Sequence, residues 1–207
     1  THLPIGDLKL NFTYPEGELS DYHHELDLST AVNTVTYKIG DTEYTRQSIA
    51  SNPDDVIAMY ITASRPEAIT MELELNLLRN AEVIASGNQL IYTGNAEFEK
   101  HGRGGVLFEG RIAVEIKGGT IKADGKKLLI DKATEVTLLS DVRTNYKNTT
   151  FAGYDYKQKC KETIEAAAKK SFKTLRNTHV EDYAPLFSRV ALSFGDNGKL
   201  NHLPNDQ

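Results

Sequence analysis

Two glutamates at the spacing of a strand face are the first candidates for chemistry in this chain. Glu72 and Glu74 stand two residues apart in the segment ITMELELNL. Glycoside hydrolysis uses a pair of carboxyl groups that flank the scissile bond. Two residues apart on one strand, however, carboxylates point in parallel at a spacing of about 7 Å, so they do not approach a bond from opposite sides. We therefore interpret this pair as part of a solvated polar face.

The histidines offer a metal site or an acid–base pair. His23 and His24 are adjacent, and adjacent strand residues point to opposite faces, so a regular strand does not let both bind one metal ion. An ordinary pair on an edge strand is the favoured interpretation. His179 and Asp182 stand three apart in a predicted short helix, where they could share a face or a hydrogen bond. We favour a role in holding the structure together over a catalytic role.

A glycine-rich loop, HGRGG, occupies residues 101–105. It lacks the Gly-Lys-Ser/Thr ending and the following helix of a phosphate-binding loop, so it does not predict nucleotide binding. A mobile loop is the favoured interpretation. A loop that lines the cleft of a neighbouring domain is the alternative.

The single cysteine, Cys160, excludes an internal disulfide. It falls on the apolar face of a predicted helix, which favours a small buried side chain over a reactive thiol. With one cysteine and scattered histidines, the sequence does not predict a structural zinc site. The residues therefore identify no catalytic side chain, no metal ligand and no cofactor.

Carbohydrate-binding residues are unknown from the sequence. Glycosylation patterns occur at residues 11–13 (NFT) and 148–150 (NTT), and the first falls inside a predicted strand. Sugar recognition commonly uses exposed aromatic side chains, but the chain has no Trp, and its 10 Tyr and 7 Phe mostly fall on predicted core faces. This composition weakens the interpretation of an independent carbohydrate-binding module.

Alternating apolar and polar residues predict the strands that position these groups. The longest alternation places five apolar residues on one face, namely Ile69, Met71, Leu73, Leu75 and Leu77. Shorter runs of the same kind lie at residues 8–14, 35–39, 57–61 and 112–116. Turn signals separate the runs at residues 40–41, 52–55, 86–88, 118–119 and 124–125.

These runs number roughly a dozen before residue 142, too many for one open sheet. Only one side of each strand reads as apolar, as a two-layer sandwich requires. The sequence therefore predicts a mainly β fold, a two-layer antiparallel β-sandwich followed by a C-terminal linker helix. We assign residues 1–150 to the sandwich domain.

Residues 151–207 form the expected helical linker and returning strand, leading to a further domain outside the chain. Asp155 can cap a helix that reaches about residue 176, with an apolar stripe that includes Cys160. Thr178 and Glu181 have the spacing of a capping box, which predicts that a second, short helix begins there. Pro185 is expected to end it, and residues 190–194 to form a strand. If this segment joins domains, Tyr183, Leu186 and Phe187 should leave an apolar surface.

Charge and hydropathy exclude several classes of protein. The formal net charge of -5 and the pI of about 5.7 argue against nucleic-acid binding, which needs a basic face. No segment approaches the roughly 18 apolar residues of a membrane span. Residues 1–4 (THLP) show neither a signal peptide nor an initiator Met, so we expect a longer parent chain.

Several segments together resemble one family. They are residues 4–8 (PIGDL), 24–31 (HELDLSTA), 35–37 (VTY), 44–47 (YTRQ), 50–57 (ASNPDDVI), 179–183 (HVEDY) and 186–190 (LFSRV). In order and spacing they are similar to the N-terminal β-sandwich domain of glycoside hydrolase family 95, the inverting α-L-fucosidases and related L-galactosidases. The family's opening strands, which precede the PIGDL segment, are expected to lie outside the chain.

The resemblance implies a β-supersandwich of the galactose mutarotase-like type, a helical linker and an (α/α) barrel. The barrel is the catalytic domain to which residues 151–207 would lead, and it holds the catalytic acid outside this chain, so no catalytic residue transfers. The barrel of the parent chain is the implied partner, carbohydrate is bound through it, and the implied location is the periplasm or the cell exterior. Two other functions stay open. An independent carbohydrate-binding module would show exposed aromatics in a row. A mutarotase-like enzyme would need a His and a carboxylate facing each other across a concave sheet.

Overall fold

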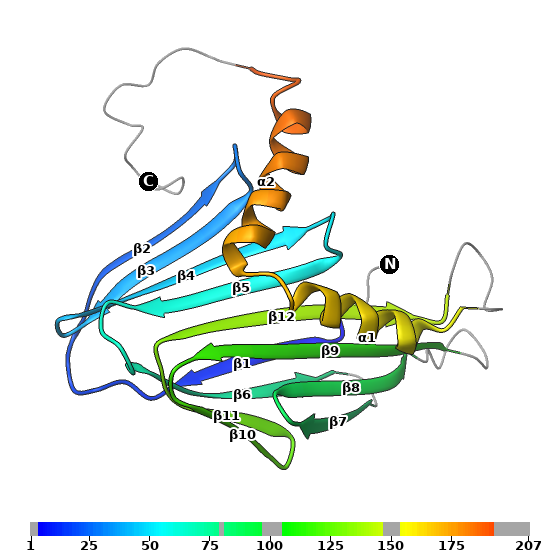
Figure 1. Ribbon diagram of the computed structural model, residues 1–207, viewed down its shortest axis with the longest axis horizontal. Coiled ribbons are helices and arrows are strands. Elements are labelled where there is room, and N and C mark those ends of the chain that lie inside the picture. Colours follow the sequence, from blue (N-terminus) through cyan, green and yellow to red (C-terminus); the bar gives the residue numbers. More distant parts are fainter. Residues whose placement is uncertain (1–3, 79–80, 97–104, 147–153, 193–207) are drawn as a thin grey trace.

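The computed structural model of the chain describes residues 4–78, 81–96, 105–146 and 154–192, and it confirms a mainly β fold (Figure 1). The described residues form twelve strands, close to the number predicted. The strands are β1 (Gly6–Phe12), β2 (Leu19–Asp27), β3 (Val32–Ile39), β4 (Thr42–Ser51), β5 (Val56–Ala63), β6 (Ile69–Leu77), β7 (Ala81–Ser86), β8 (Gln89–Ala96), β9 (Val106–Lys117), β10 (Thr120–Asp124), β11 (Lys127–Ala133) and β12 (Glu135–Thr144).

The strands form two antiparallel sheets, as the sequence predicts. One sheet has the order β1-β6-β11-β10, and the other has the order β2-β3-β4-β5-β12-β9-β8-β7. The main core lies between the sheets and is built from the alternating residues, including Ile69, Met71 and Leu73. The predicted hairpin turns are present. At the β9–β10 turn, for example, Gly118 and Gly119 adopt φ angles of 72° and 67°, which glycine accepts without strain.

The central strands differ from the prediction that each strand has only one apolar side. Two helices cover the outer face of the eight-stranded sheet and make a third layer over its centre (Figure 1). Ala58 of β5, Ala113 of β9 and Leu139 of β12 are buried under them in a second core. Ile57, predicted to point into the core, is instead 59% exposed. Its cross-strand neighbours are the small residues Ala50 and Ser140, which cover little of its side chain.

The helices are α1 (Tyr156–Ala167) and α2 (Phe172–Phe187), and their boundaries correct the prediction. The N-cap at Asp155 is confirmed, since its side chain accepts from the backbone N–H of Gln158 at 3.0 Å. The helix does not continue to residue 176 but breaks at residues 168–171. We call this bend the elbow. It allows the apolar faces of both helices to pack against the outer face of the eight-stranded sheet.

The predicted capping box at Thr178 and Glu181 is wrong, because Thr178 lies inside α2. Its hydroxyl donates to the carbonyl of Thr174, one turn earlier, at 2.9 Å. The N-cap of α2 is Ser171, which has extended backbone angles and accepts from the N–H of Thr174 at 3.1 Å. Pro185 does not end the helix at once, since α2 continues to Phe187.

The predicted strand at residues 190–194 is not present where the structure describes it. Val190 and Leu192 belong to no strand and are largely exposed, and residues 193 and 194 lie outside the described residues. Residues 190–192 therefore do not pair with any described strand, despite their apolar pattern.

The revised helix boundary makes a testable prediction. Ser171→Ala should lower the free energy of unfolding by about 0.5–2 kcal/mol, because it removes the N-cap of α2. Thr178→Ala should have a smaller effect, since it removes only a hydroxyl that bonds back to the preceding turn. Urea denaturation of both variants measures the difference. A larger effect at Thr178 than at Ser171 would contradict the boundary seen here.

Candidate functional site

The turn between β2 and β3 holds one side of α2. The carbonyl of Thr30 accepts a hydrogen bond from Nε2 of His179 at 3.0 Å, and the carbonyl of Leu28 accepts from the Tyr183 hydroxyl at 2.9 Å. The turn itself is fixed by Asp27, whose carboxylate accepts from the N–H and hydroxyl of Ser29 and from the Thr30 hydroxyl. These bonds hold the pKa of Asp27 below its usual range.

The turn between β4 and β5 holds the elbow and the other side of α2. Asn52 donates to the Asp182 carboxylate at 3.3 Å. The carboxylate of Asp54 is only 2% exposed, and it binds Lys170 of the elbow at 2.5 Å and the Ser51 hydroxyl at 2.7 Å. His179 and Asp182 therefore do not bond to each other; each ties α2 to a different turn. The favoured interpretation, that they hold the structure together, agrees with these contacts.

Past these anchors, the distal half of α2 presents an apolar surface. The rings of His179, Tyr183 and Phe187 form a ladder, with centroids 6.0 Å and 5.6 Å apart. Leu186 is 53% exposed and Phe187 is 44% exposed, while Tyr183 is half-buried against Leu28. We call Leu28, Tyr183, Leu186 and Phe187 the α2 apolar surface. Leu186 and Phe187 are open as expected, whereas Tyr183 is half-buried, and in Figure 1 this end of the helix extends past the ends of β2 and β3.

A cluster of buried charges lies beneath α1, and the sequence reading missed it. In β9, Arg111 binds Glu109 at 2.8 Å, and in β12, Arg143 binds Asp141 at 2.7 Å. The register places Asp141 opposite Arg111 and Arg143 opposite Glu109, so charges alternate across the strands. The sequence signal is weak: an acidic and a basic residue stand two apart in each strand, but β9 contains a second such pair, Glu115 and Lys117, whose side chains are exposed.

Cys160 of α1 sits over this cluster. Its thiol is fully buried and lies 3.5 Å from the carbonyl of Asp141. Burial, reinforced by the nearby Asp141 carboxylate, raises the pKa of Cys160 to about 12. A thiol that stays protonated at neutral pH is a poor nucleophile, so the interpretation of a small buried side chain is supported.

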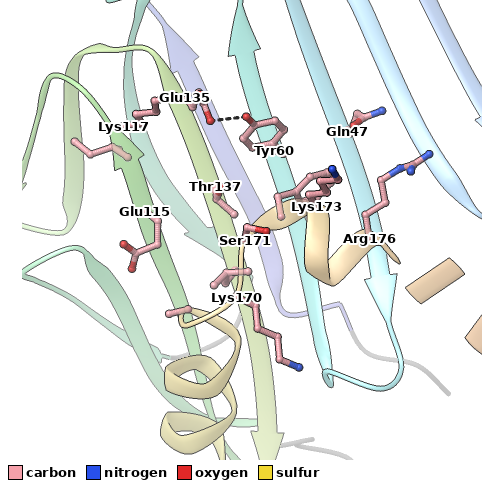
Figure 2. Close-up of a pocket in the computed structure, with 14 residues that line it drawn as sticks. Gln47, Tyr60, Glu115, Lys117, Glu135, Thr137, Lys170, Ser171, Lys173 and Arg176 are labelled. Atoms are coloured by element: carbon pink, nitrogen blue, oxygen red, sulfur yellow. Dashed lines mark hydrogen bonds and ion pairs between the residues drawn. The ribbon is translucent and has the colours of Figure 1, made fainter. Parts of the chain in front are cut away.

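A cavity of about 660 Å³ lies between the elbow and the outer face of the eight-stranded sheet (Figure 2). On its floor, the Tyr60 hydroxyl donates to Glu135 at 2.5 Å, and Lys117 binds the same carboxylate at 2.7 Å. Lys117 and then Tyr60 hold the pKa of Glu135 below its usual range. Burial and the bond to Glu135 raise the pKa of Tyr60 to about 12, so this hydroxyl stays protonated.

Two cations of α2 reach the same cavity without ion-pair partners among the described residues. Figure 2 shows Lys173 and Arg176 beside Gln47 and Tyr60. Nε of Arg176 is buried and has no hydrogen-bond partner within the described part of the chain. No sequence motif marks this site, because its residues come from four strands, the elbow and α2.

The glutamates of β6 do share a face, as predicted, but they bind a lysine instead of flanking an open site. Lys127 of the neighbouring strand β11 approaches Glu72 at 2.7 Å and Glu74 at 3.0 Å. The hydrogen bond from Lys127 holds the pKa of Glu72 below its usual range. The structure therefore supports a polar strand face. Asn11, in the first glycosylation pattern, donates to Glu72 at 3.4 Å from the edge strand β1.

The adjacent histidines lie on the edge strand β2, as favoured above. His23 binds Glu25 at 3.0 Å, and His24 binds Asn33 of β3 at 2.6 Å, so they have separate partners. Within the described ranges, no three His, Cys, Asp or Glu side chains gather as a metal site would require. Residues 101–104 of the glycine-rich loop and the pattern at 148–150 lie outside the described residues. Neither described helix is long and apolar enough to span a membrane.

Comparison with known proteins identifies relatives of this chain. The family model "Glycosyl hydrolase family 65, N-terminal domain" matches residues 1–149. The chain is 30% identical over 216 residues to Alpha-L-fucosidase 2 of Arabidopsis thaliana, covering 91% of the chain and 25% of that protein. It is 30% identical over 204 residues to Probable alpha-fucosidase A of Aspergillus niger, covering 90% of the chain and 25% of that protein. The chain thus spans about a quarter of the length of these relatives.

Solved structures share the fold. A putative kojibiose phosphorylase from the human microbiome superposes with a TM-score of 0.58 at 12% identity, over 84% of this chain and 27% of that one. A bacterial glucoamylase complexed with acarbose superposes with a TM-score of 0.53 at 8% identity, over 88% of this chain and 32% of that one. The resemblance to the N-terminal domain of α-L-fucosidases agrees with the named relatives. The chain belongs to the family of glycosyl hydrolase family 65 N-terminal domains.

Proposed function

We propose that this domain is the non-catalytic scaffold of a larger α-L-fucosidase-like glycosidase, whose catalytic groups lie in an (α/α) barrel that follows it in the parent chain. The relatives named as fucosidases support this proposal, since the chain matches only a quarter of each. The resemblance to family 95 supports the barrel as the partner domain.

The observation that carries the proposal is the way α2 is held. Segments 24–31, 50–57 and 179–183, which carry the family resemblance, contain the two turns and the helix face that they bind. An α-helix clamped on two sides by separate turns has a fixed direction. The apolar surface at its distal end is therefore presented in one orientation, as a rigid docking element for a neighbouring domain requires.

The charges of the domain fit this role better than they fit catalysis. Glu72 and Glu74 are bound to Lys127, and the described histidines each have a structural partner. A mutarotase-like mechanism would need a His and a carboxylate open to a substrate between them. His24 lies opposite Val35 of β3, and its hydrogen-bond partner is Asn33 of the same strand.

An activity assay tests the proposal directly. The purified chain should show no hydrolysis of an aryl α-L-fucoside above buffer, because the proton donor and the water-activating group lie in the barrel. The full-length parent should hydrolyse the same compound. Turnover by the chain alone, lost when one of its own residues is replaced, would overturn the scaffold role; an inactive parent would overturn the fucosidase assignment.

A further inference from the structure

We propose that the cavity at the elbow binds an acidic monosaccharide, with its carboxylate on Arg176 and Lys173 and its ring against the sheet. The site lies at the start of α2, whereas the α2 apolar surface lies at its distal end. It is a binding function of this chain itself.

The cavity has room for a sugar ring. Its volume of about 660 Å³ lies within the range of roughly 300–1,000 Å³ that small-molecule sites occupy. Tyr60 and Phe172 both line the cavity, and they stack on each other at 4.9 Å between ring centroids, so the faces they turn to each other are closed to a ligand. The remaining apolar surface of the two rings can contact the carbon atoms of a sugar, while the polar groups around them meet the hydroxyls.

The cations point to a ligand with one anionic group. Of the four basic residues that line the cavity, Lys117 is paired with Glu135 and Lys170 with Asp54. Lys173 and Arg176 have no acidic partner among the described residues, although the chain as a whole carries a net charge of -5. Arg176 is partly exposed and has no counter-ion within the described part of the chain, so a carboxylate in the cavity could form charge-assisted bonds with its terminal N–H groups.

The opposite wall selects against a more highly charged ligand. Glu115 and Glu135 line this side, so a di- or triphosphate would meet repulsion there. Glu135 accepts from Tyr60 and Lys117 but keeps lone pairs that could accept from sugar hydroxyls. The side chains of Gln47 and Thr137, for which the described residues supply no partner, can donate or accept as well. One carboxylate with several neutral hydroxyls satisfies both walls.

Titration of the chain with D-glucuronate tests the proposal, with isothermal calorimetry as the readout. Glucuronate should bind at least about tenfold more tightly than glucose, which lacks the carboxylate, or acetate, which lacks the ring. Arg176→Gln should weaken glucuronate binding by about 10- to 100-fold, the range expected when a charged hydrogen bond is lost. Lys173→Gln, at an exposed helix position where unfolding is not expected, should weaken it about threefold to tenfold.

Lys161→Gln is the matched control, because Lys161 is an exposed lysine of α1 that does not line the cavity. It should leave binding unchanged. Glucuronate binding no tighter than acetate binding, no measurable binding at all, or equal losses in Lys161→Gln and Lys173→Gln would each overturn the proposal. None of these results depends on fucoside hydrolysis by the parent, so a failure here is distinguishable from a failure of the scaffold role.

Discussion

Replacing Arg143 by methionine should lower the free energy of unfolding by about 3–5 kcal/mol, the loss expected when one member of a buried ion pair is removed. Arg143 binds Asp141 at 2.7 Å and also reaches Asp55 at 3.2 Å. The Asp141 side chain is only 7% exposed, so the variant leaves a buried carboxylate without its main cation. Burial opposes the charge on Arg143, but the hydrogen bonds and charges of Asp141 and Asp55 together outweigh it, so the pKa of the guanidinium is raised.

Two further variants isolate the cause of this loss. Lys161→Met removes a cation from an exposed pair with Glu165, 3.8 Å apart on α1, and should change stability by less than about 0.5 kcal/mol. Adding Asp141→Asn to Arg143→Met removes the unpaired charge and should recover part of the loss. Urea denaturation measures these three variants and Asp141→Asn alone. If Asp141→Asn lowers the stability of the Arg143→Met variant by as much as it lowers that of the unchanged chain, the two residues are not coupled.

This charge cluster also shows where sequence reasoning reaches its limit. Alternation correctly predicted β6 and its buried residues Ile69, Met71 and Leu73, because a two-layer strand buries one face. β9 and β12 are instead covered on both faces, one by the second sheet and the other by α1. Where both faces of a strand are buried, alternation no longer separates buried from exposed positions, so the sequence did not reveal that Glu109 and Asp141 are buried.

The boundaries of the helices also have two kinds of cause, one local in the sequence and one long-range. Asp155 could be predicted as a cap because the signal lies within a few residues. The break at residues 168–171 could not, because AKKS contains neither Gly nor Pro. It depends on contacts made far along the chain: Lys170 with Asp54, and Phe172 with Tyr60. The cavity at the elbow exists because of that break, so no local pattern could have marked it.

The family segments gave a different kind of information. They identified a set of segments that occurs in one family, but they did not predict which contacts these segments make with one another. His179 meets a carbonyl 149 positions earlier in the chain, and Asp182 meets a side chain 130 positions earlier. The topology brings the β2–β3 and β4–β5 turns to the same side of the sheet as α2. This placement explains why the three segments contact one another.

Two leucines of α2 allow the docking role of this helix to be measured. Leu175 is fully buried against the sheet, so Leu175→Ala should cost about 2–5 kcal/mol in the chain alone and in the full-length parent. Leu186 is 53% exposed, so Leu186→Ala should stay within about 0.5 kcal/mol of the unchanged chain when the domain is studied by itself.

In the parent, the same exposed leucine should behave as a buried one. If the barrel covers the α2 apolar surface, Leu186→Ala removes interdomain packing and should destabilise the parent by about 1.5–3 kcal/mol, the value of a buried leucine side chain. The lower melting temperature of the parent variant, compared with the unchanged melting temperature of the isolated chain variant, is the decisive measurement. Leu175→Ala controls for ordinary core damage, since it acts alike in both. A small effect of Leu186→Ala in both proteins would show that this end of α2 faces solvent in the whole molecule, and the barrel would then have to dock elsewhere on the domain.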